Sequence, residues 1–135
     1  MSKISDVKAI QVFDSRGIPT ISCKITLENQ ISASAMVPSG ASTGSKEALE
    51  LRDNDLIYNG KGVLKAILNI NNKLAPLIIG KDPNNQIEVD KILIDFDGTD
   101  DKSSMGANAI LAISLANSHV AAKSKGLNLY EHFSK

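Results

Sequence analysis

The chain lacks the residues and patterns that mark several classes of protein. It has a single cysteine, Cys23, no tryptophan, and only 4% aromatic residues in 135 positions. One cysteine cannot form an internal disulfide, which fits a reducing compartment. No apolar run approaches the roughly 20 residues of a membrane-spanning helix, and the first residues have no apolar stretch of signal-peptide length. We therefore expect a cytoplasmic protein with no membrane span.

The chain also lacks an excess of either charge. Fifteen Lys and Arg residues balance fifteen Asp and Glu residues. Nothing in that balance favours a nucleic-acid partner. Hydrophobic residues make up 42% of the chain and charged residues 22%, which is typical of a globular domain. The length allows one core, so we expect residues 1–135 to form one domain.

The first third of the chain predicts three β-strands. Residues 4–13 are mixed apolar and polar, with Val7, Ile10 and Val12 as candidate buried positions. Residues 21–28 alternate strictly between apolar and polar, as a half-buried strand does. Residues 31–37 form a third strand. Short turns separate the three, so an antiparallel meander is expected.

The rest of the chain predicts helices. A short helix is expected over residues 45–53, and a second from about Val63, ended by Pro76 and Gly80. Asp82 followed by Pro83 is a helix-start signal for a third helix, which reaches about residue 97. The fourth covers residues 108–125, is rich in alanine, and is placed centrally because small residues allow close packing. The predicted fold class is α+β: a three-stranded antiparallel meander followed by about four helices.

Between strands and helices lies a segment of small residues: Pro38, Ser39, Gly40, Ala41, Ser42, Thr43 and Gly44. Such a loop can place backbone N–H groups around a phosphate, and a serine oxygen can bind Mg²⁺. It can equally be a surface loop, and it is not a P-loop. The charged residues that follow, from Glu47 to Asp55, fit a solvated helix face.

The remaining candidates for chemistry have structural interpretations. Cys23 lies in the alternating strand and is interpreted as buried rather than nucleophilic. His119 and His132 have no second ligand at metal-binding spacing. Residues 97–101 are acidic but do not form a calcium loop, so a turn is expected. The residues alone therefore reveal no general base and no activated nucleophile.

Six segments, in order, carry a family resemblance that no one of them carries alone. They are residues 13–17 (FDSRG), 37–44 (VPSGASTG), 47–53 (EALELRD), 58–63 (YNGKGV), 97–99 (DGT) and 106–111 (GANAIL). In sequence and order these resemble enolase, over about residues 4–133. The chain is similar to the N-terminal domain that caps the catalytic α/β barrel of that family.

The resemblance implies a function for the intact enzyme. Enolases remove water from 2-phosphoglycerate to give phosphoenolpyruvate, and two Mg²⁺ ions hold the developing charge. The lysine base, the assisting glutamate and the carboxylate ligands of the first Mg²⁺ belong to the barrel, which this sequence does not contain. We therefore expect no catalytic residue in the chain and no activity from the chain alone.

What the resemblance assigns to this domain is a lid over the substrate. The residues concerned are Ser39, Gly40, Ala41, Ser42 and Thr43. Ser42 matches the serine that binds the second Mg²⁺ through its carbonyl and hydroxyl oxygens, which suits a hard cation. Gly40 can absorb the backbone change of closure. Arg16 matches an arginine at the contact between the subunits of a homodimer.

Three positions depart from the family pattern. Ile18 replaces a usual asparagine, Ser22 replaces a glutamate that pairs across the dimer, and Lys46 replaces a histidine after the lid. The second departure puts one subunit contact in doubt. Lys46 adds positive charge near the entrance of the site.

Two other functions remain open. One is a stand-alone interaction module with the same fold, since enolases are also surface binders of host proteins in some bacteria. A surface or secreted fraction would then be reached without a signal peptide. The other is the capping domain of a related enzyme acting on a different carboxylate, against which residues 39–44 and 47–53 argue.

Overall fold

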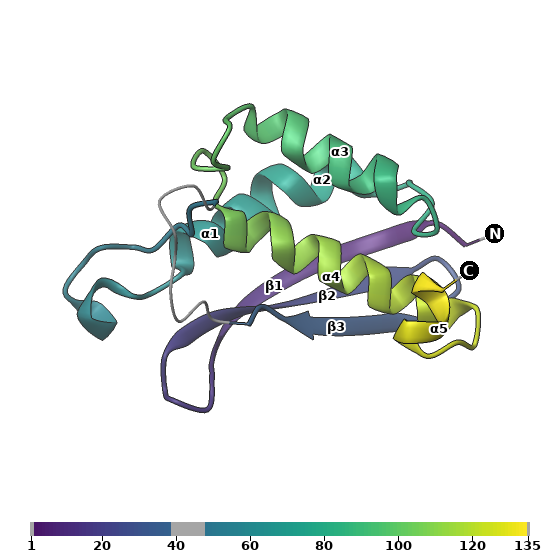
Figure 1. Cartoon of the computed structure of the whole chain (residues 1–135), viewed down its shortest axis with the longest axis horizontal. Helices are drawn as coiled ribbons and strands as arrows, with labels where there is room; N and C mark the ends of the chain where they lie inside the picture. The colour runs from purple at the N-terminus through teal and green to yellow at the C-terminus, as the bar shows by residue number, and fades with distance from the viewer. Residues whose placement is uncertain (1, 39–47, 135) are drawn as a thin grey trace.

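A computed structural model describes residues 2–38 and 48–134, and shows a sheet covered on one face by helices (Figure 1). The three strands are β1 (Ile4–Phe13), β2 (Pro19–Leu27) and β3 (Ser32–Met36), antiparallel in the order β1-β2-β3. The meander and the α+β class predicted from the sequence are confirmed.

The register of β1 and β2 decides which side chains enter the core. Val7 lies opposite Ile25 and Ala9 opposite Cys23, and all four are buried. Ile10 pairs with Ser22 on the other face and is 54% exposed, so its predicted burial is wrong. Side chains alternate between the two faces of a strand. Ile10 therefore cannot share a face with Val7.

The helices follow the sheet in four stretches within the described residues. The first runs without interruption through α1 (Leu64–Asn69), a π-helical turn η2 (Ile70–Leu74) and α2 (Ala75–Ile78). Then come α3 (Gln86–Asp97), α4 (Ala107–Ser124) and α5 (Leu129–Phe133). A 3-10 turn, η1 (Ile57–Gly60), precedes them in the loop that projects from the domain (Figure 1).

Helix α4 is the centre of the helical layer, as its alanine content predicts. It packs on β2 and β3, while α3 packs on α4 and α2 at the outside (Figure 1). Ala109, Ala112, Ala116 and Ala121 of α4 are fully buried. Their small side chains let the helix axis approach the sheet closely. Gly126 follows α4 with a φ of +68°, the left-handed conformation expected of a helix stop.

Two predicted helix boundaries are wrong for local reasons. Pro76 does not end a helix but lies in the first turn of α2, where the helical stretch continues directly from the π-helical turn η2. Helix α3 starts at Gln86 rather than after Asp82. Asp82 accepts a hydrogen bond from the Asn84 N–H instead, and Asn85 caps the helix by accepting from the Glu88 N–H.

Candidate functional site

The predicted lid residues Ser39, Gly40, Ala41, Ser42 and Thr43 lie outside the described residues. The structure does describe the chain on both sides of them. Val37 precedes the segment and residues 48–53 follow it. These two flanks determine where the segment is attached to the domain.

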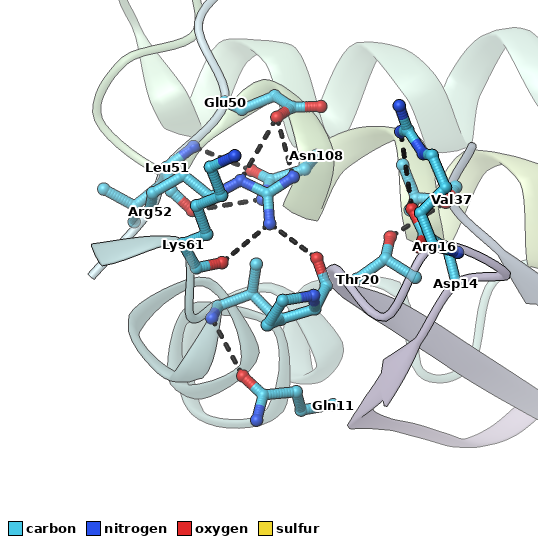
Figure 2. A network of polar contacts seen from close by, with 12 residues as sticks. Gln11, Asp14, Arg16, Thr20, Val37, Glu50, Leu51, Arg52, Lys61 and Asn108 are labelled. Atoms are coloured by element: carbon cyan, nitrogen blue, oxygen red, sulfur yellow. Dashed lines mark hydrogen bonds and ion pairs between the residues drawn. The ribbon is translucent and has the colours of Figure 1, made fainter. Parts of the chain in front are cut away.

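The flank before the segment is fixed to the start of β2. The Val37 N–H donates to the Ile21 carbonyl at 2.9 Å. The Thr20 hydroxyl donates to the Val37 carbonyl at 2.8 Å (Figure 2). Thr20 and Val37 are both buried. The backbone at Val37 is therefore held by hydrogen bonds that water does not reach.

The flank after the segment is not helical. Residues 48–53 were predicted to lie in a short helix, but their backbone is irregular and bonds to a distant part of the chain. The Leu49 N–H donates to the Asp101 carbonyl at 2.8 Å, and the Ala107 N–H donates to the Leu49 carbonyl at 2.7 Å. The helical prediction fails because these tertiary partners replace the local i to i+4 bonds.

The side chain of Asn108, at the start of α4, continues this pairing. Its Oδ1 accepts from the Leu51 N–H at 2.9 Å and its Nδ2 donates to the Leu51 carbonyl at 3.1 Å (Figure 2). Asn108 is buried. An asparagine at the start of a predicted alanine-rich helix was the available sequence signal. The partner lies 57 residues away, so the contact itself was not predictable.

Arg52 connects three parts of the domain (Figure 2). One guanidinium nitrogen, Nη1, donates to the Pro19 carbonyl at 2.6 Å and to the Lys61 carbonyl at 2.8 Å. Nε and Nη2 donate to Glu50 Oε2 at 3.3 and 3.0 Å. The predicted solvated helix face is therefore wrong for these residues. The cluster joins the flank at 48–53 to the sheet and to the loop before α1.

The Asp53 side chain binds the N-terminal N–H groups of α1. Its carboxylate is buried and accepts from the Leu64 and Lys65 N–H groups at 3.0 and 2.9 Å. Helix N-termini carry unsatisfied N–H groups and a partial positive charge, which a carboxylate neutralises. Gly62 makes room for it, since a Cβ there would lie 2.6 Å from Asp53 Oδ2.

Arg16 lies in the β1–β2 hairpin, away from residues 48–53. Asp14 shapes the hairpin, because its Oδ1 accepts from the Arg16 and Ile18 N–H groups at 2.8 and 2.9 Å. The Arg16 guanidinium lies 3.5 Å from Asp14 Oδ2 and is about half exposed (Figure 2). Beside the hairpin, the rings of Phe13 and Tyr58 meet edge to face at 5.2 Å. The predicted subunit contact at Arg16 stays a prediction.

Cys23 and the histidines offer no chemistry in the described residues. Cys23 is fully buried, and burial raises the pKa of its thiol to about 12, so it is not a nucleophile. His132 lies 3.2 Å from Lys125 Nζ, and burial with that positive charge lowers its pKa. Across residues 2–38 and 48–134, no three His, Cys, Asp or Glu side chains come close enough to hold a metal ion.

Asp97 organises the turn between α3 and α4. Its carboxylate accepts from the Met105 N–H at 2.6 Å, from the Thr99 N–H at 3.0 Å and from the Thr99 hydroxyl. Burial would raise the pKa of Asp97, but these hydrogen bonds outweigh it and hold the pKa below its ordinary value of 3.8. The turn predicted over residues 97–101 is confirmed. It places the Asp101 backbone carbonyl where it accepts a hydrogen bond from the Leu49 N–H.

An apolar hollow of about 260 Å³ lies between α3 and α4, next to the flank at residues 48–53. Ala48, Ile94 and Leu111 line it, with Asp90 and Lys102 among the other lining residues. Ile94 and Leu111 are 41% and 40% exposed. The helical layer therefore presents apolar surface beside the attachment point of residues 39–47.

None of the helices in the described parts of the chain is long and apolar enough to cross a membrane.

Comparison with known families agrees with this architecture. The family model described as enolase, N-terminal domain, matches residues 4–133. That range takes in all three strands and every helix from α1 to α5. The chain therefore belongs to the enolase N-terminal domain family.

Proposed function

We propose that this chain is the capping domain of an enolase that dehydrates 2-phosphoglycerate to phosphoenolpyruvate. The family match over residues 4–133 carries the proposal. In this proposal, a separate barrel supplies the lysine base and the assisting glutamate of the reaction. The chain alone is then inactive.

In this proposal, residues 39–43 form the lid over the substrate. Val37 and Leu49, on either side of the segment, are both held by backbone hydrogen bonds. A lid with fixed ends can close over a substrate and exclude water without moving its own domain. Ala41 and the neighbouring glycine and serines are small enough to approach a substrate closely.

Ser42 is proposed to bind the second Mg²⁺ of the intact enzyme. Its hydroxyl and carbonyl are neutral oxygen donors, which Mg²⁺ accepts beside a phosphate. When bound, Mg²⁺ supplies positive charge that stabilises the negative charge developing on the substrate. In this proposal, the remaining ligands of the ion come from the barrel.

Arg16 is proposed to contact a partner subunit in a homodimer. It projects from the β1–β2 hairpin with about half of its side chain exposed. The hairpin conformation is set by Asp14. The arginine is therefore presented on a defined turn rather than on a free chain end.

The first experiment is an activity assay on the product of the whole gene, read to its stop codon. Formation of phosphoenolpyruvate from 2-phosphoglycerate is followed at several Mg²⁺ concentrations. Ser42→Ala is compared with Ser34→Ala, which removes the same hydroxyl from an exposed position on β3. We expect Ser42→Ala to lower turnover by about 10²-fold, the order seen when one oriented electrostatic group is lost. Ser34→Ala should leave turnover unchanged.

The outcomes separate the enolase proposal from the interaction module. Turnover by the wild type, lost selectively in Ser42→Ala, supports both the enzyme and the lid. Equal activity of both serine variants would contradict the role of Ser42 but keep the enzyme. If the gene product shows no turnover at all, the capping-domain proposal fails and the interaction module becomes the better explanation.

A further inference from the structure

The two outer strands of the sheet, β1 and β3, differ in how their edges are covered. Along β1, the Asn71 side chain accepts from the Ala9 N–H at 2.8 Å and donates to the Ala9 carbonyl at 3.1 Å. At the start of that strand, the Ile4 N–H donates to the Lys81 carbonyl at 3.0 Å, and the Ile4 carbonyl accepts from the Gly80 N–H at 2.8 Å. The chain from η2 to residue 81 therefore occupies backbone groups of β1 through which a further strand would pair.

The hydrogen bonds at the two ends of β3 determine which of its backbone groups face outward. The Val37 N–H donates to the Ile21 carbonyl at 2.9 Å, and the Leu27 N–H donates to the Ile31 carbonyl at 2.8 Å. In an antiparallel pair, residues that bond to the neighbouring strand alternate with residues that do not. The residues of β3 that turn their N–H and carbonyl groups away from β2 are therefore Ser32, Ser34 and Met36.

The outward edge of β3 is largely open in the part of the chain that the structure describes (Figure 1). Lys123 Nζ donates to the Ser32 carbonyl at 2.9 Å. Among residues 2–38 and 48–134, no other group bonds to the outward backbone of Ser34 or Met36, and both residues are exposed. The strand contains neither a charge nor a proline, which natural edge strands use to prevent further pairing. Its backbone is therefore available to an added strand.

We propose that β3 pairs antiparallel with β3 of a second copy of the chain, about a two-fold axis through Ser34. Ser34 is the middle residue of Ser32–Met36. The axis places Ser34 opposite Ser34 of the partner subunit, and Ser32 opposite Met36 of the partner subunit. Each of these pairs joins residues whose backbone groups face outward, so the row of donors and acceptors is its own complement. The pairing depends neither on the proposed reaction nor on the contact proposed at Arg16.

The side chains of β3 are compatible with this pairing. Ala33 lies opposite Ala35 of the partner subunit, and the two Ser34 hydroxyls meet across the axis, where serine pairs are favourable. The Ser32 carbonyl has two lone pairs, so it can accept from Lys123 and from a partner N–H together. The two Lys123–Ser32 contacts lie about 13 Å apart along the strands, beyond the screening length of about 8 Å at physiological ionic strength. The two lysines therefore repel each other little.

The first experiment compares Ser34→Pro with Ser34→Ala in the product of the whole gene. The Ser34 N–H makes no bond to β2, so proline there keeps the ladder but removes the central outward donor. Ser34→Ala removes the hydroxyl and keeps that donor. Sedimentation is followed from about 10 μM to about 1 mM, because a pairing of two short strands is a weak interface. We expect the mass to double with concentration in wild type and Ser34→Ala, and a dissociation constant at least about tenfold higher in Ser34→Pro.

The second experiment tests the two-fold axis by exchanging charge at Ser34. Ser34→Lys alone and Ser34→Glu alone each place like charges opposite one another, which destabilises a cross-strand pair. An equal mixture of the two variants places opposite charges there instead. We expect the dissociation constant to rise about tenfold in each variant alone and to return to within about threefold of wild type in the mixture. A different register, or a different partner strand, does not produce this rescue.

Amide hydrogen exchange locates the contact in the wild type. We expect exchange at the Ser34 and Met36 amides to slow about tenfold as the protein concentration is raised through the dissociation constant. The Ala33 and Ala35 amides point toward β2, so their exchange should not change with concentration. Slower exchange at Ser34 on addition of an unrelated extended peptide, without any effect of protein concentration, would contradict a second copy as the occupant.

Other results would also overturn the inference. A wild type whose mass stays constant up to about 1 mM does not self-associate in the expected range. Doubling that persists in Ser34→Pro and in both charged variants places the contact elsewhere, and doubling lost in Arg16→Ala alone places it at the hairpin. If Ser34→Pro does not fold, the charged variants and their mixture decide. Absence of turnover in the activity assay bears on the proposed function and leaves the sedimentation result as it stands.

Discussion

At the scale of single residues, three polar side chains bind backbone groups that lie between 8 and 57 residues away in the sequence. Arg52 reaches the carbonyls of Pro19 and Lys61, Asn108 pairs with Leu51, and Asp97 accepts from Met105. Each satisfies donors or acceptors of irregular backbone that would otherwise be buried without a partner. Their residue types were visible in the sequence, but their partners were not, because no local spacing relates them.

Asp97 should make the stability of the domain depend on acid pH. Its folded-state pKa is lowered, so its ionised form stabilises the fold above the ordinary pKa of 3.8, and this stabilisation is lost as pH falls through the lower folded-state pKa. We expect Asp97→Asn to be less stable than wild type at neutral pH. Denaturant unfolding from about pH 6 down to about pH 3 should then show a smaller loss of stability in the variant.

Asp100→Asn is the control for this comparison. Asp100 is exposed and lies in the same turn, so its substitution should leave the unfolding free energy and its pH dependence close to those of wild type. Parallel pH profiles for wild type and Asp97→Asn would contradict the assigned role of the Asp97 carboxylate.

At the scale of elements, the strands were predicted well and the segment at 48–53 was not. The alternation over residues 21–28 needs only the period of two that a half-buried strand imposes. Ile21, Cys23, Ile25 and Leu27 are indeed fully buried. Residues 48–53 contain good helix formers, but their propensity is worth a few tenths of a kcal/mol per residue. Tertiary bonds to Asp101, Ala107 and Asn108 outweigh it.

The contact between this segment and α4 should make substitution of Gly106 strongly destabilising. Gly106 and Gly80 both have positive φ, at +100° and +89°, but only Gly106 is crowded, whereas nothing lies within 4 Å of a Cβ at Gly80. We expect Gly80→Ala to cost about 1 kcal/mol from backbone strain. Gly106→Ala should cost about 3 kcal/mol, since overpacking adds to the strain. Chemical denaturation of both variants measures the difference.

Equal costs for the two glycine variants would show that Leu51 and Asn108 move aside without penalty. The close approach seen in the structure would then not be required. A much larger cost at Gly106 would support a segment held tightly against the first turn of α4. Hydrogen exchange at Leu51 would report whether the displaced contact is the one to Asn108.

At the scale of the whole molecule, one core joins the sheet and the helices. The core draws on all three strands and on the helices from α1 to α4. Cys23 lies inside it, fully buried and with its pKa raised to about 12. As the single cysteine of the chain, it reports on the opening of this core and on no other event.

A thiol reagent should therefore label the folded protein only as fast as the core opens. We expect labelling of Cys23 to be slow in native conditions and to accelerate with denaturant in parallel with global unfolding. The labelled mass is followed by mass spectrometry, with fully denatured protein as the upper limit. Rapid labelling without denaturant would contradict the buried position of Cys23 in β2.

The sequence by itself determined the class of fold, the order of its elements and the family. These depend on local periodicity, on helix-stop glycines such as Gly126, and on short motifs whose order is visible in the sequence alone. Only the tertiary structure decided what holds residues 48–53 and which charges are internal. The bonds of Asn108 and Arg52 join segments separated by up to 57 residues. Such contacts exist only once the sheet and α4 have packed together, so no local pattern encodes them.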